Sequence, residues 1–187
     1  MPQNIFLKRK QDIFSKQDKS SRQHVDEKIA GLCEKINQKE NYYTTSSCSG
    51  RVILIIESDK KEHGLFVKIY HDLISFEQLK KDLKNIKNKK TISFKQEPCG
   101  LHVACRTLKD AQQFLDKAKF AGWKKSGIIA SNKRFVVECF STEKLEFPII
   151  SNGKILVNDD FLKLIVKKSN ENLRRSWNKI EKLRRLI

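Results

Sequence analysis

The stretch YYTTSSCSGR (residues 42–51) gathers side chains that can bind polar ligands. Its hydroxyl groups belong to Thr44, Thr45, Ser46, Ser47 and Ser49. Gly50 permits close approach of the backbone to a bound group, and Arg51 adds a positive charge. We therefore predict a loop that binds an anion or a polar ligand and leads into a buried strand. The alternative is a turn whose hydroxyls satisfy its own backbone.

Cys48 suggests a second chemistry within the same stretch, that of a thiol nucleophile. Such a thiol needs a neighbouring base or a lowered pKa, and the sequence shows no cysteine-protease context. A cysteine-dependent hydrolase is therefore the least favoured alternative. The five cysteines of the chain are scattered, with no CxxC spacing among them. This pattern argues against a zinc ribbon, a thioredoxin motif or a disulfide framework, and we predict no metal site.

The charge of the chain points to a polyanionic partner. Its 187 residues include 39 Lys and Arg against 22 Asp and Glu, a net charge of +17. Lysines crowd the segment 80–95, and nine basic residues lie in 163–187. Cations near a helix C-terminus stabilise the helix, but nine exceed that need. We expect a surface that follows the phosphates of a nucleic acid, whose affinity falls about a thousandfold from low to moderate salt. A solvated lysine surface is the alternative.

Hydrophobic periodicity and turn signals predict an α+β protein. Helices are expected over 3–16, 25–36, 75–86, 107–122 and 158–187. Strands are expected around 51–57, 64–70, 91–97, 101–105, 127–130 and 134–140. This order predicts helices packed on a mixed, largely antiparallel sheet in two layers, with a long C-terminal helix.

Several absences in the sequence narrow the class of protein further. The seven glycines never form G-x-G, so we predict a fold other than the doubly wound nucleotide-binding one. No linker or boundary divides residues 1–187, and we expect one domain. No apolar run of about 18 residues and no signal peptide are present, so we expect a cytosolic protein without a membrane partner. A monomer is favoured.

Two motifs carry a resemblance to a known family. The segment NYYTTSSCSGR (41–51) closely resembles the signature of the tRNA wybutosine-synthesizing protein 3 family. The segment EPCGLHVACRTLKDAQQFLDKAKFAGWKKSGI (97–128) resembles the second block of that family. His71 falls where the family has a histidine that closes its second strand. The resemblance extends from about residue 5 to the end of the chain.

The resemblance implies a methyltransferase that uses S-adenosylmethionine. Its substrate would be the 4-demethylwyosine-type tricyclic base at position 37 of tRNA(Phe), methylated at N4 beside the anticodon. The implied fold is an α+β fold unlike the Rossmann methyltransferases, in agreement with the missing G-x-G. A non-catalytic tRNA-binding module with the same fold is the competing hypothesis.

The resemblance also implies roles for particular residues. Candidates for the base that accepts the proton from N4 are His71 and His102, each with a structural role as the alternative. Candidates for cofactor binding are Ser47, Ser49, Gly50, Arg51, Ser126 and Gly127. Candidates for substrate binding are Tyr43, Thr45, Cys48, Arg106, Arg174 and Arg175; a core position is the alternative for Tyr43. The sequence departs from the family at Phe66 and at Tyr70-His71, which affects substrate detail more than reaction type.

Overall fold

The computed structural model describes residues 3–15, 26–60 and 63–187, and these form two compact units. The first unit comprises Met1–Ser49, Cys99–Thr142 and Ser176–Ile187 within those limits. The second comprises Gly50–Pro98 and Glu143–Arg175. The chain therefore passes between the units four times, and the last passage falls inside one continuous helix, α5 (Asp159–Leu186).

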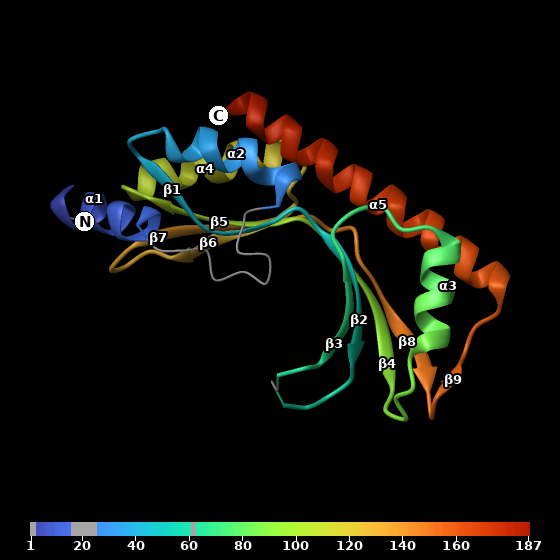
Figure 1. The fold of residues 1–187 in the computed structure, drawn as a ribbon. Helices are drawn as coiled ribbons and strands as arrows, with labels where there is room; N and C mark the ends of the chain where they lie inside the picture. The colour runs from blue at the N-terminus through green and yellow to red at the C-terminus, as the bar shows by residue number, and fades with distance from the viewer. Residues whose placement is uncertain (1–2, 16–25, 61–62) are drawn as a thin grey trace. The chain divides into compact units, whose positions relative to one another are not determined.

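The first unit is built on a four-stranded antiparallel sheet in the order β1-β5-β7-β6 (Figure 1). The strands are β1 (Tyr42–Cys48), β5 (Gly100–Cys105), β6 (Lys125–Ala130) and β7 (Phe135–Phe140). Its helices are α1 (Gln3–Phe14), α2 (Glu27–Asn37), α4 (Leu108–Phe120) and the last part of α5.

Helices α2 and α4 lie on the same face of this sheet and enclose the core of the unit with the end of α5 (Figure 1). Ile29 and Ile36 from α2, Phe114 from α4 and the side chain of Trp123 are fully buried there. The start of α4 is fixed by a capping box, in which the side chains of Thr107 and Asp110 bond each other's backbone N–H groups.

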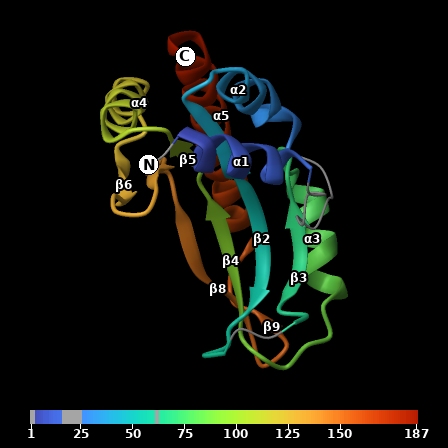
Figure 2. The same ribbon diagram turned by 90° about the vertical axis from the view of Figure 1, so that its left-hand side faces the viewer.

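The second unit is built on a five-stranded antiparallel sheet in the order β3-β2-β4-β8-β9 (Figure 2). The strands are β2 (Arg51–Ile56), β3 (Phe66–Tyr70), β4 (Ile92–Glu97), β8 (Leu145–Ser151) and β9 (Lys154–Ile155). Helix α3 (Phe76–Asn85) and the first part of α5 complete the unit.

These two helices pack on one face of the second sheet. The hydroxyl of Tyr70 on β3 donates to Asp82 on α3 at 2.7 Å. On α5, Asn172 donates to the side-chain oxygen of Gln96 at 2.7 Å, a buried polar contact between helix and β4. Phe94 stacks on Phe147 with ring centroids 5.3 Å apart, and both rings fill the space beneath α5.

The α+β class, the antiparallel pairing and the long C-terminal helix are confirmed. Asn158 caps α5 as predicted, because its side chain accepts from the N–H of Phe161 at 3.0 Å. The loop predicted for residues 42–48 is wrong, since this segment is strand β1. The strands divide over two sheets, and β8 and β9 were not predicted. The predicted helix limits at residues 16 and 25 lie outside the described residues.

Candidate active site

A histidine and a glutamate meet on the sheet of the first unit. The Nε2 atom of His102 on β5 lies 2.9 Å from Oε1 of Glu138 on the neighbouring strand β7. The two side chains are 31% and 36% exposed, so a ligand can reach them from solvent. A carboxylate only accepts hydrogen bonds, so this contact places a proton on Nε2 and leaves the lone pair of Nδ1 available in the neutral ring.

The register of the four strands shows which residues share this face. Ser46, His102, Glu138 and Gly127 stand opposite one another in one row across β1, β5, β7 and β6. Side chains in such a row project to the same side of a sheet, as do those two residues away along a strand. The next row on this side therefore contains Cys48, Gly100, Phe140 and Lys125. We call this side of the first sheet the His102 face.

The bend in β1 lies next to the histidine. The pairing of β1 with β5 shifts between Thr44 and Ser46, as expected of a β-bulge. Such bulges re-aim side chains and are frequent beside active sites. The hydroxyls of Thr45 and Ser46 are exposed at this point, and Thr45 Oγ1 donates to the backbone carbonyl of His102 at 3.4 Å. The bulge therefore presents two hydroxyl groups beside the histidine.

A glycine and a phenylalanine support the imidazole from the adjacent row. A Cβ atom at Gly100 would lie 2.4 Å from the ring of Phe140, so only glycine lets this ring lie over β5. The same ring meets the His102 imidazole edge to face, with centroids 6.0 Å apart and planes at 87°. Glu138 and Phe140 thus hold the histidine on two sides.

The opposite face of the first sheet takes up three of the predicted cofactor-binding serines. Ser47 and Ser126 lie in the row of Leu101 and Cys139, which belong to the buried core. The hydroxyl of Ser126 donates to the backbone carbonyl of Trp123 at 2.6 Å. Ser49 is 1% exposed, and both its N–H and its hydroxyl donate to Asp26. These hydroxyls support the sheet from the side of the helices.

Two further predicted substrate residues of the first unit lie outside the row of His102. Tyr43 stands opposite Ala104, two residues from His102 on β5, so it projects to the His102 face, but it is buried at 5% exposure against Phe6 of α1 and is a core residue. Arg106 follows the end of β5, four residues after His102, which corresponds to about 13 Å along a strand. The His102 face thus brings together Thr45, Cys48, His102 and Gly127 of the predicted set, with Tyr43 on the same face but buried under α1.

The second unit holds the remaining predicted residues. Nε of Arg51 donates to Glu97 on β4 at 2.6 Å, and the guanidinium lies 5.5 Å from the ring of Phe66. An anion bound by Arg51 must therefore compete with Glu97. Gly50 has φ of 95°, a conformation that favours glycine. His71 follows β3, and its Nδ1 atom is buried. Arg174 and Arg175, which are consecutive in the sequence, are exposed on α5.

Sequence reasoning missed Glu138, although a signal for it exists. The strand 135–140 reads FVVECF, an apolar segment with one charged residue inside it. A charge in such a position needs a partner. The partner, His102, is 36 residues away in sequence, and only the strand register identifies it.

The part of the chain that the structure describes contains no group of three or more His, Cys, Asp or Glu side chains that could hold a metal ion. None of the helices in the same residues is long and apolar enough to cross a membrane.

The cysteines differ in accessibility, and this leads to a first prediction. All five lie in described residues and none forms a disulfide; Cys33, Cys99, Cys105 and Cys139 are buried, whereas Cys48 is half-buried on the His102 face. Burial raises the pKa of Cys33 to about 11 and that of Cys139 to about 12, so these groups remain thiols at pH 8. A disulfide reagent at pH 8 should therefore modify Cys48 first. Thiol titration followed by peptide mass analysis measures this.

The variant Cys48→Ser provides the control for this labelling. It should lose the fast-reacting thiol in the native protein, whereas both proteins should react at every remaining cysteine in denaturant. Fast labelling of Cys33 or Cys139 in the native protein would contradict the described packing of the core.

Comparison with known proteins identifies relatives along the whole fold. Residues 7–187 match the family described as Methyltransferase TYW3. A Xenopus laevis protein named tRNA wybutosine-synthesizing protein 3 homolog is 38% identical over 183 residues, 92% of this chain and 72% of that protein. A Methanocaldococcus jannaschii protein named tRNA(Phe) 7-((3-amino-3-carboxypropyl)-4-demethylwyosine(37)-N(4))-methyltransferase is 38% identical over 156 residues, 81% of this chain and 80% of that protein. The solved structure of the PH1069 protein from Pyrococcus horikoshii has a TM-score of 0.87 and 32% identity, and covers 98% of this chain and 94% of its own.

The fold and these matches define a methyltransferase outside the doubly wound class. Strand pairs in the described residues are antiparallel, whereas a doubly wound fold is built on a mostly parallel sheet. The chain belongs to the TYW3 methyltransferase family. The family resemblance predicted from the two sequence motifs is therefore confirmed.

Proposed function

We propose that this protein uses S-adenosylmethionine to methylate N4 of 7-(3-amino-3-carboxypropyl)-4-demethylwyosine at position 37 of tRNA(Phe). The observation that carries the proposal is the partly exposed His102–Glu138 pair on the first sheet of a chain from this methyltransferase family. The names of the relatives supply the substrate. The proposed partner is the anticodon region of tRNA(Phe), and the proposed location is the cytoplasm.

His102 is the proposed base of the reaction. N4 loses a proton when it gains a methyl group, and a histidine within reach can accept that proton. Because Glu138 accepts from Nε2, the accepting atom is Nδ1. Glu138 is a positioning residue, since it holds the ring orientation and the tautomer through this hydrogen bond. Proton transfer of this kind contributes about 10²–10⁴-fold to a rate.

The donor groups of the His102 face fit a polar cofactor. Thr45 and Ser46 present exposed hydroxyls that can bind ribose or carboxylate oxygens. A Cβ atom at Gly127 would meet no atom within 4 Å, so the space directly over this backbone is open to a ligand. These residues would hold S-adenosylmethionine, which supplies an electrophilic methyl group. Aligning that group with N4 is worth about 7–11 kcal/mol of the barrier.

The basic side chains have the complementary task of binding the tRNA. Arg51 and Arg106 are proposed anchors for phosphate or carboxylate groups, because a guanidinium matches these anions in geometry. The exposed Arg174 and Arg175 are proposed contacts to the RNA backbone.

Ligand-induced stabilisation separates the enzyme from a tRNA-binding module without activity. The enzyme should be stabilised by S-adenosylmethionine and by S-adenosylhomocysteine, by about 2.7 kcal/mol at a hundredfold excess over Kd. Thermal unfolding with and without each compound measures this effect. Affinity for tRNA without stabilisation by either compound would favour the non-catalytic module.

The reaction itself is tested with labelled S-adenosylmethionine and tRNA from a strain blocked at this methylation step. Nucleoside mass analysis should show one added methyl group on the tricyclic base at position 37. The same tRNA from an unblocked strain is the control and should accept no label at this base. Absence of label from the blocked-strain tRNA would overturn the proposed substrate.

A further inference from the structure

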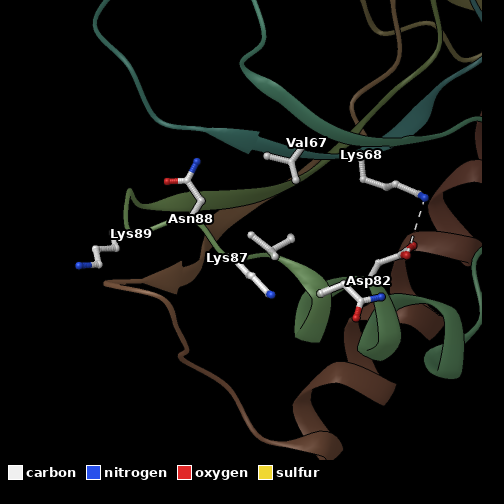
Figure 3. A pocket seen from close by; sticks show the side chains of 8 residues that line it. Val67, Lys68, Asp82, Lys87, Asn88 and Lys89 are labelled. Atoms are coloured by element: carbon white, nitrogen blue, oxygen red, sulfur yellow. Dashed lines mark ion pairs between the residues drawn. The ribbon is translucent and has the colours of Figure 1, made fainter.

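The second unit contains an open pocket of about 560 Å³ beside helix α3 (Figure 3). It is lined by Val67, Lys68, Asp82, Asn85, Ile86, Lys87, Asn88 and Lys89. Its residues come from strand β3, from α3 and from the segment 86–89 that follows this helix (Figure 3). The volume lies within the range of sites that bind small molecules, about 300–1,000 Å³. We call it the α3 pocket.

The charge of the α3 pocket is positive. Three lysines line it against one carboxylate, that of Asp82. Lys68 pairs with Asp82 at 3.7 Å, and the Tyr70 hydroxyl also donates to this carboxylate. Lys87 and Lys89 are exposed, and neither forms an ion pair with another residue in 3–15, 26–60 or 63–187. Two cations therefore remain available to an anionic ligand.

The segment that carries these two lysines is held in a defined conformation. Helix α3 ends at Asn85, and Ile86 adopts an extended backbone with ψ of 115°. The side chain of Asn88 accepts from the N–H of Lys90 at 2.8 Å, which forms an Asx-turn. Lys87 and Lys89 thus flank Asn88, whose side chain stabilises this segment through the Asx-turn.

The apolar part of the lining suits a ligand that carries apolar groups in addition to a phosphate. Val67 and Ile86 supply apolar surface, and Asn85 and Asn88 supply amide groups. Lysine and asparagine side chains are among the groups that contact the phosphates and sugars of nucleic acids, and a sugar can cover adjacent apolar surface.

We propose that the α3 pocket binds the sugar–phosphate backbone of the tRNA substrate, at nucleotides other than the one that is methylated. This inference rests on tRNA being the substrate. Its tests measure RNA binding directly, so that they remain informative if the proposed methylation reaction is wrong.

The first test is charge reversal in the pocket. Lys87→Glu/Lys89→Glu should weaken tRNA binding about tenfold or more in low salt, and should lower the slope of log Kd against log salt by about two. Fluorescence anisotropy with labelled tRNA measures both quantities. Stabilisation by S-adenosylmethionine should be unchanged. Both lysines are exposed, so folding should be preserved, and circular dichroism checks this.

A matched control variant is Lys109→Glu/Lys133→Glu, which makes the same charge change at two exposed lysines of the first unit. It should weaken tRNA binding much less than the pocket variant. Equal weakening by both variants would show a general effect of net charge and would overturn the proposed site.

The second test locates the contact without any mutation. An amine-reactive acylating reagent should modify Lys87 and Lys89 in the protein alone and modify them several-fold less in the tRNA complex, whereas Lys109 and Lys133 should stay reactive. Peptide mass analysis gives each rate. Protection without methyl transfer would support the pocket and refute the reaction. Transfer without protection would support the reaction and refute the pocket.

Discussion

Replacing His102 with alanine should lower kcat for methyl transfer by about 10²–10⁴-fold, because the proton on N4 then has no positioned acceptor. The KM for tRNA should change little, since the imidazole is proposed to act on the reacting group and not to bind the RNA backbone. Added imidazole should restore part of the lost activity, because it can occupy the vacated space and accept the proton. Single-turnover kinetics with and without imidazole measure these effects.

Controls for this result are available among the other histidines. His63 is exposed in the second unit, and His63→Ala should retain wild-type kcat. Glu138→Ala should lower kcat with little change in KM, because it removes the hydrogen bond that orients His102. A large loss of kcat in His71→Ala, together with normal activity of His102→Ala, would show that the base has been assigned to the wrong histidine.

Phe94→Ala should lower the free energy of unfolding by about 3–5 kcal/mol, because it leaves a cavity in the core of the second unit. The ring is fully buried and stacks on Phe147. Both tryptophans of the chain, Trp123 and Trp177, belong to the first unit, so tryptophan fluorescence reports on that unit alone. Circular dichroism reports on both units.

The same experiment tests whether residues 1–187 unfold as one domain. We expect fluorescence and circular dichroism to give coincident urea transitions, shifted together in the variant, as in a single cooperative unit. Phe120→Ala is the control: this ring is 70% exposed, and the change in stability should stay within about 0.5 kcal/mol. A fluorescence transition that keeps its midpoint in Phe94→Ala would show that the first unit unfolds independently as a second domain.

Local sequence signals predicted most of the elements but not their distribution over two sheets. Capping residues and apolar stripes mark α3, α4 and α5, because a helix is stabilised by contacts a few residues apart. Which strands pair depends on residues far apart in sequence, and alternation of apolar and polar residues is the same in one sheet or two. The Ser- and Thr-rich segment 42–48 shows the limit: its hydroxyls suggested a loop, but its tyrosines and threonines also favour a strand.

Only part of the candidate site could be predicted, again because strand pairing joins residues that are far apart in sequence. His102 was identified as a candidate base from the family resemblance, and Cys48 and Thr45 from their place in the polar motif that carries it. The partner of His102 and the face on which each serine lies depend on cross-strand register. Ser47 and Ser46 are neighbours in the motif, yet they project to opposite sides of the sheet, toward the core and toward His102 respectively.

The segmented composition of the two units has a consequence for the gene. The first unit is encoded in three separated stretches and the second in two, and codons for helix α5 serve both. Neither unit is encoded by one continuous stretch of codons. A single deletion or gene fusion therefore cannot remove one unit or donate it to another protein without dividing the other. The smallest portion of this sequence that recombination can transfer with its fold intact includes both sheets.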